Sequence, residues 1–184
     1  KQVLREVRAQ VLGEVERGGV AKSQLHILAG LTKLRQAACD PRLLGLPREF
    51  SHDDSGKLSA LRELVEEVDS GGHKVLIFSQ FVSMLKLVRE ALDEDKIRYE
   101  CLDGSTIDRS ECVDNFQNDP TIPVFLISLK AGGSGLNLTA ADTVIHFDPW
   151  WNPAVEDQAS DRAHRIGQKK VVTIYRLVAA GTIE

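Results

Sequence analysis

The chain has 184 residues and a mass of 20.3 kDa, enough for one domain with a full hydrophobic core and too few for two ordinary ones. Apolar residues make up 42% of the sequence and charged residues 27%, which excludes disordered and fibrous proteins, and no apolar run is long enough for a membrane span or a secretory signal. The net charge is −4, but residues 1–50 carry 9 basic and 5 acidic side chains, whereas the rest is acidic. We expect an intracellular domain and, because no initiator Met is present, a fragment of a longer protein.

The first fifty residues predict a helical hairpin. Apolar side chains recur at helical spacing over residues 3–15 and again over 22–38, after two adjacent glycines. Residues 41–55 contain Pro, Gly and a polar run, which is typical of a connector. We therefore place a boundary between residues 1–50, the hairpin with its connector, and residues 51–184.

The second region predicts an α/β fold. Short apolar runs alternate with amphipathic helical patterns, the order expected for crossover units of a parallel sheet. Covering such a sheet requires helices on both faces, so we expect an open parallel sheet preceded by the helical hairpin. The expected strands are 74–78, 97–102, 123–128, 143–147 and 171–177, and the expected helices are 57–68, 81–92, 109–117 and 153–165.

A glycine-rich segment, residues 128–137, follows the third expected strand. Open α/β sheets bind ligands at the carboxyl ends of their strands, and glycines allow backbone amides to approach an anion closely. Ser128 and Lys130 would add a hydroxyl and a charge. The same spacing fits a turn that binds nothing, so both readings stay open.

A helix is expected to begin at Asn152, which is a good N-cap residue and is followed by proline. On this helix Gln158, Arg162 and Arg165 would share one face and direct two guanidinium groups the same way, an arrangement that suits a phosphate. The alternative is a solvated helix in which Asp161 pairs with Arg165, worth about 0.3 to 0.5 kcal/mol.

Two other turns carry polar or aromatic residues that fit either function or structure. Ser105 and Thr106 follow an expected strand, where their hydroxyls would contact a nucleic-acid phosphate or cap the next helix. Trp150 and Trp151 either both pack in the core or divide between the core and stacking on a partner.

Several familiar sites are excluded. Lys57 ends a Ser-Gly-Lys run, but position 51 is serine where a P-loop needs its first glycine, and Leu58 replaces the hydroxyl residue that binds magnesium. The five histidines and three cysteines lack metal-ligand spacing, so no metal site is expected.

Taken together, the segments resemble the second RecA-like lobe of the Swi/Snf family of DNA-translocating ATPases, within helicase superfamily two. Residues 74–81 are similar to the family's motif IV, 128–138 to motif V, and 158–168, which follow the segment 148–153, to motif VI. The segments 34–41 and 102–106 also match, so the resemblance covers nearly the whole chain.

The resemblance implies that Arg162 and Arg165 act as arginine fingers on the γ-phosphate of ATP. It implies that residues 1–50 are the family's protrusion and that 51–184 are the RecA-like lobe. The implied lining of the ATP cleft is Gln158, Gly133, Gly135 and Asn137, and the implied DNA contacts are Ser79, Gln80, Ser105, Thr106 and Lys130.

The family's Walker A motif and acidic box belong to its first lobe and are missing here. ATP and Mg²⁺ would therefore be held mainly by an N-terminal RecA-like lobe of the same parent chain, and this chain alone is expected not to hydrolyse ATP. The expected partner is double-stranded DNA, with an unidentified protein target and no membrane. The expected setting is the cytoplasm or nucleoid of a prokaryote, which the compact lobe favours, or a eukaryotic nucleus.

Two alternatives stay open. One is the lobe of a strand-separating or RNA-directed helicase. The other is a non-enzymatic α/β module in which Arg162 and Arg165 hold a phosphorylated ligand or a partner protein.

Overall fold

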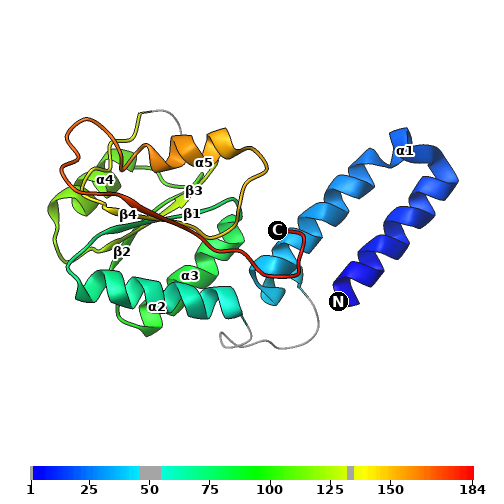
Figure 1. Ribbon diagram of the computed structural model, residues 1–184, viewed down its shortest axis with the longest axis horizontal. Helices are drawn as coiled ribbons and strands as arrows, with labels where there is room; N and C mark the ends of the chain where they lie inside the picture. Colours follow the sequence, from blue (N-terminus) through cyan, green and yellow to red (C-terminus); the bar gives the residue numbers. More distant parts are fainter. Residues whose placement is uncertain (1, 46–54, 132–134) are drawn as a thin grey trace. The chain divides into compact units, whose positions relative to one another are not determined.

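The computed structural model describes residues 2–45, 55–131 and 135–184 (Figure 1). The chain divides into two compact units, residues 56–178 and residues 1–55 together with 179–184. The boundary expected at residue 50 falls outside the described residues. None of the described helices combines the length and the apolar character that crossing a membrane requires.

The first unit contains helix α1 (Gln2–Cys39), which folds back on itself (Figure 1). A Cβ atom at Gly30 would lie 2.8 Å from a methyl group of Val7 and 3.2 Å from one of Val11, so the two halves of α1 approach closely where only glycine fits. The hairpin is therefore present, as one continuous helix rather than two. After it, the Asp40 carboxylate caps the short 3-10 helix η1 (Pro41–Leu44) by accepting the backbone N–H of Arg42 at 2.9 Å.

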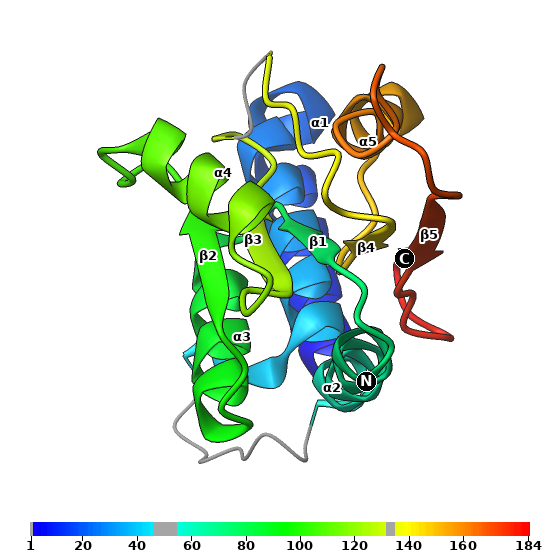
Figure 2. The same cartoon turned by 90° about the vertical axis from the view of Figure 1, so that its left-hand side faces the viewer.

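The second unit is an open sheet of five parallel strands in the order β2-β3-β1-β4-β5 (Figure 2). Helices α2 and α3 lie on one face and α4 and α5 on the other (Figure 1), which confirms the expected α/β fold. The strands are β1 (Val75–Ser79), β2 (Tyr99–Leu102), β3 (Val124–Ser128), β4 (Thr143–His146) and β5 (Thr173–Arg176), and the helices are α2 (Gly56–Ser70), α3 (Val82–Glu94), α4 (Arg109–Asn118) and α5 (Pro153–Ser160).

The central strands form the core because helices cover both of their faces. Every residue of β1, β3 and β4 is buried, and the stacked rings of Phe116 and Phe125, 5.2 Å apart, tie α4 to β3. Every residue of the edge strand β5 is exposed. Since all five strands run the same way, the segments that follow them meet at one edge of the sheet.

The helix expected over 153–165 ends at Ser160, so that prediction is wrong for its last five residues. Residues 161–167 form successive turns. The backbone tightens there, since the N–H groups of Arg162 and Ala163 bond the carbonyls three residues earlier, and the carbonyl of Arg162 accepts the backbone N–H of Leu138 at 3.0 Å. The two arginines are therefore presented by turns and not by a helix face.

Candidate functional site

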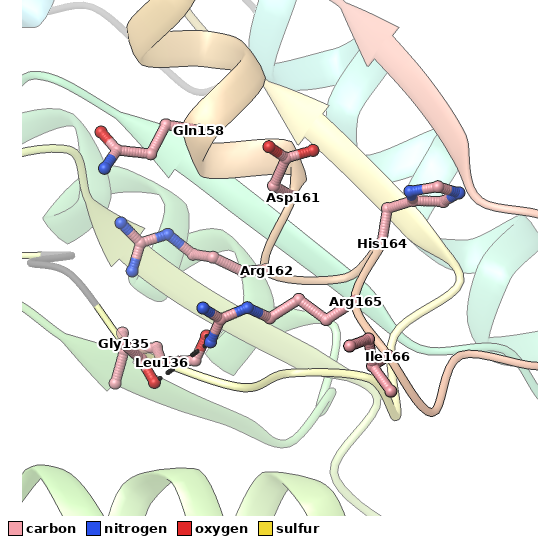
Figure 3. A pocket seen from close by; sticks show the side chains of 8 residues that line it. All are labelled: Gly135, Leu136, Gln158, Asp161, Arg162, His164, Arg165 and Ile166. Carbon is pink, nitrogen blue, oxygen red and sulfur yellow. Dashed lines mark hydrogen bonds between the residues drawn. The ribbon is translucent and has the colours of Figure 1, made fainter.

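A cavity of about 450 Å³ opens at the carboxyl edge of the sheet, between the end of α5 and the segment that follows β3 (Figure 3). The side chains of Gln158, Arg162 and Arg165 lie one above another in it and point the same way. The grouping expected from the sequence is thus retained although the helix that was to provide it is shorter. The cavity is lined by Gly135, Leu136, Gln158, Asp161, Arg162, His164, Arg165 and Ile166.

The two arginines have different environments. Arg162 is 8% exposed, and both its burial and the neighbouring charge of Arg165 lower the pKa of its guanidinium group. Arg165 is exposed, and its Nη1 donates to the carbonyl oxygens of Gly135 at 3.3 Å and Leu136 at 3.2 Å. Two adjacent positive charges, one of them desolvated, favour an anionic ligand.

The alternative in which Asp161 neutralises Arg165 is wrong, since these two described residues form no ion pair. The helix ends before it could bring their side chains together on one face, and the guanidinium bonds backbone carbonyls instead.

Gln168 holds the arginine turns to the segment after β3, a role that the sequence analysis missed. Its side-chain Nε2 donates to the carbonyls of Thr139 at 3.1 Å, Ala141 at 2.7 Å and Ala163 at 3.1 Å. Its Oε1 accepts the backbone N–H of Lys170 at 2.9 Å. Gln168 lies within the motif VI resemblance, but nothing in the sequence indicates that its main partners are backbone carbonyls almost thirty residues earlier.

Two buried polar side chains, His146 and Glu156, connect α5 to the sheet. The ring of His146, fully buried and stacked on Phe78, places Nε2 2.9 Å from the hydroxyl of Ser160, the last residue of α5. The Glu156 carboxylate accepts the backbone N–H of Trp150 at 2.8 Å and the guanidinium Nε of Arg176 at 2.7 Å. The end of α5, where the arginine turns begin, is therefore fixed to β4 and β5.

The buried His146 should make the free energy of unfolding depend on pH. Burial lowers its pKa in the folded chain, against the opposing charge of Glu156, so between pH 6.5 and this lower value the unfolded chain binds more protons. The free energy of unfolding therefore keeps its full His146 contribution above about pH 6.5. Below that pH it decreases, by at most about 1.4 kcal/mol per pH unit. In urea unfolding at pH 7.5, 6.5 and 5.5, followed by tryptophan fluorescence, we expect His146→Gln to flatten this dependence. The exposed His26→Gln variant should retain it, and an equal slope in both variants would contradict the assignment.

The residues expected near DNA follow three different strands and meet at the carboxyl edge of the sheet. Gln80, after β1, is half-buried, and Lys130, after β3, is exposed. Ser105 is exposed after β2, and its backbone N–H and hydroxyl both donate to the Asp103 carboxylate, at 2.8 and 2.6 Å. The half-buried Thr106 accepts the backbone N–H of Asp103 on its hydroxyl oxygen at 3.0 Å.

Ser79 differs from the others in that group. Its side chain is fully buried, and its hydroxyl donates to the Asp148 carboxylate at 2.5 Å. This hydroxyl is therefore committed inside the lobe. The alternative that Ser105 and Thr106 cap the next helix is wrong, because Asp108 is the N-cap of α4 and accepts the backbone N–H of Glu111 at 2.9 Å.

The remaining predicted site residues are placed as follows. Asn137 and Gln158 are exposed, Gly135 has the left-handed φ of 108° that favours glycine, and Gly133 lies outside the described residues. Trp151 is 62% exposed, so core packing of both tryptophans is wrong. Among the residues with described positions, no group of three or more His, Cys, Asp or Glu side chains is arranged to hold a metal ion.

Comparisons with known proteins assign the family. The helicase conserved C-terminal domain matches residues 56–167. The Sulfolobus solfataricus SWI2/SNF2 ATPase core in complex with dsDNA superposes with a TM-score of 0.80 at 36% identity, covering 96% of this chain and 37% of that one. The C-terminal domain of the same ATPase gives a TM-score of 0.78 at 33% identity, covering 97% and 73%. The chain belongs to the Swi2/Snf2 family.

Within the Swi2/Snf2 family the chain is similar to eukaryotic proteins. It is 53% identical over 133 residues to the chromatin-remodeling ATPase INO80 of Aspergillus oryzae and 52% identical over 133 residues to that of Neurospora crassa. The match covers 71% of this chain but only 9% and 7% of those proteins. The Swi2/Snf2 C-terminal lobe described here is thus a small part of the length of its curated relatives.

Proposed function

We propose that this chain is the C-terminal motor lobe of an ATP-dependent double-stranded-DNA translocase that remodels chromatin. The observation that carries the proposal is the cavity in which Arg162, Arg165 and Gln158 point the same way. Arg162 is buried, and the backbone that carries its side chain is held by the hydrogen bond from Leu138. Such a preorganised pair suits the γ-phosphate of ATP, where negative charge is spread over the transferring group.

In this proposal the two arginines act as fingers on ATP that a second lobe presents. Arg162 would stabilise charge on the transferring phosphoryl group, and Arg165 would contact the same group from the solvent side of the cavity. Gln158, Gly135 and Asn137, with Gly133 in the same segment, would line the cleft. Mg²⁺ would supply neutralisation of the phosphate charge, and it and the nucleotide would be held mainly by the N-terminal RecA-like lobe of the parent chain.

Double-stranded DNA would lie along the carboxyl edge of the sheet. Lys130 offers an exposed positive charge there, which suits contacts to a phosphate backbone without base readout, and Gln80, Ser105 and Thr106 lie in the segments that follow β1 and β2, the two strands next to β3. We assign Ser79 to the same region as a residue that positions its neighbours. The related archaeal core in complex with dsDNA supports this partner.

The cellular setting follows from the relatives. The INO80 proteins that match this chain are chromatin-remodeling ATPases of fungi, so we propose chromatin as the target and the nucleus as the location. These relatives give no support to the prokaryotic setting that the sequence analysis favoured.

The test is ATP hydrolysis by this chain alone and by a longer polypeptide that joins it to a first RecA-like lobe, each with and without double-stranded DNA. We expect the chain alone to be inactive and the two-lobe protein to hydrolyse ATP faster when DNA is added. Failure of the two-lobe protein to respond to DNA would refute the proposal, and nucleotide or phosphopeptide binding by the chain alone would then favour a non-enzymatic binding module.

Duplex DNA with a labelled strand and RNA, used as substrates, distinguish a double-stranded-DNA translocase from a strand-separating or RNA-directed helicase. A double-stranded-DNA translocase should be stimulated by intact duplex DNA without releasing a labelled strand from it. Strand release, or stronger stimulation by RNA than by duplex DNA, would favour a strand-separating or RNA-directed helicase lobe.

A further inference from the structure

Asp148 joins the ends of two neighbouring strands at the carboxyl edge of the sheet. It lies two residues after β4 and is 1% exposed. Its Oδ1 accepts the Ser79 hydroxyl at 2.5 Å, and the backbone N–H of Gln80 lies 3.3 Å from Oδ1 and 3.2 Å from Oδ2. A buried carboxylate is stable only when donors surround it, so this geometry fixes the backbone after β1 to the backbone after β4.

On the β1 side, Asp148 orients the start of helix α3. The Ser79 oxygen that donates to Asp148 also accepts the backbone N–H of Phe81 at 3.1 Å. Phe81 is the N-cap of α3, and its carbonyl accepts the backbone N–H groups of Met84 and Leu85. Between these anchored residues lies Gln80, the proposed DNA contact.

On the β4 side, Asp148 belongs to the segment that leads into α5. The carbonyl of Phe147 accepts the buried Lys57 ammonium at 3.1 Å. The backbone N–H of Trp150 donates to Glu156 on α5, two residues before Gln158 of the arginine cavity. Between Asp148 and the cavity the chain is thus held to α5 at Trp150.

We infer that Asp148 is a positioning residue that keeps the proposed DNA contact at Gln80 in a fixed relation to the segment carrying α5 and the arginine cavity. Its role is to make ATP hydrolysis respond to DNA, and it acts through Gln80 and α5 without touching nucleotide. This inference rests on the proposed function, because it requires a DNA-stimulated ATPase.

The test is Asp148→Asn in the two-lobe protein. Asparagine keeps the size of the side chain but removes its charge and replaces an acceptor oxygen with a donor NH₂ facing Ser79 or Gln80. We expect DNA-stimulated kcat to fall about tenfold and the DNA concentration for half-maximal stimulation to rise about tenfold, the size of one charge-assisted hydrogen bond. The DNA-free rate and the KM for ATP should change less than about twofold.

The matched control is Asp142→Asn. Asp142 directly precedes β4 at the opposite edge of the sheet, is 4% exposed, and accepts His73 Nδ1 and Lys170 Nζ, both at 2.7 Å. The same change of charge in a similarly buried aspartate should leave the response to DNA intact. If both variants lower the DNA-free and DNA-stimulated rates in the same proportion, Asp148 is only structural and the inference is wrong.

Two further outcomes are distinguishable. If the unmodified two-lobe protein ignores DNA, the proposed function fails and this inference fails with it. If that protein responds to DNA and Asp148→Asn responds equally well, only the inference fails. Should Asp148→Asn not fold, Ser79→Ala removes one donor and keeps the carboxylate, and it should lower the ratio of DNA-stimulated to DNA-free rate about threefold. An unchanged ratio would contradict the inference.

Discussion

Replacing Arg162 with alanine in the two-lobe protein is expected to lower kcat for DNA-stimulated ATP hydrolysis by about 10³-fold or more. Arg162 is 8% exposed and lies beside Arg165, so its charge is partly desolvated before the nucleotide arrives. An interaction of this kind stabilises charge that develops in the transition state, and its loss appears mainly in kcat. Steady-state kinetics over a range of ATP concentrations would separate kcat from KM.

Two variants make the Arg162 result specific. Arg162→Lys keeps the charge but loses the planar fork, so it should recover only a small part of the rate. Arg98→Ala removes an arginine that is 60% exposed and pairs with Asp119 at 3.3 Å just before β2, and it should leave kcat unchanged. A normal ATPase rate in Arg162→Ala would remove the basis for the arginine-finger assignment.

Arg165→Ala is less diagnostic than Arg162→Ala. Its Nη1 bonds the carbonyls of Gly135 and Leu136, so the substitution removes both a charge in the cavity and a support of the segment after β3. We therefore place the weight of the test on Arg162.

The sheet was predictable because its strands are short apolar runs separated by amphipathic helices. All five strands lie inside the expected ranges except for the last residue of β1, which extends one residue further. Burial on both faces demands the continuous apolar side chains of the central strands β1 and β3. The strand order β2-β3-β1-β4-β5 was not predictable from periodicity, because the pattern does not reveal which strands pair.

The sequence predicted which residues lie together in the cavity better than it predicted the local backbone structure that carries them. Gln158, Arg162 and Arg165 were expected together and lie together, but the helix expected to carry them stops at Ser160. Helical periodicity continues past that residue, and the turns that replace the helix are bonded to Leu138, in a segment more than twenty residues earlier. The Ser79 hydroxyl suits a phosphate contact by its type, but it lies at the buried end of β1 and bonds Asp148, which the local sequence does not reveal.

Replacing Gln168 with glutamate is expected to lower kcat of the two-lobe protein by about 10- to 100-fold. A carboxylate oxygen in place of Nε2 would face the carbonyls of Thr139, Ala141 and Ala163 at 2.7–3.1 Å and would repel all three. The turns that carry Arg162 would then move from the segment after β3. Leaving the buried carbonyls unpaired should also cost about 1–3 kcal/mol of unfolding free energy, measurable for this chain by urea unfolding.

The matched control for Gln168 is Gln117→Ala. Gln117 on α4 accepts the backbone N–H of Ala140 at 2.8 Å, so it supports the same segment from the other side without contacting the arginine turns. Both variants should lose stability, but only the Gln168 variant should lose kcat beyond what the loss of folded protein explains. Equal kinetic losses would mean that the segment after β3, and not its connection to the arginine turns, sets the rate. A selective loss would show that the cavity depends on a side chain that contributes no charge to it.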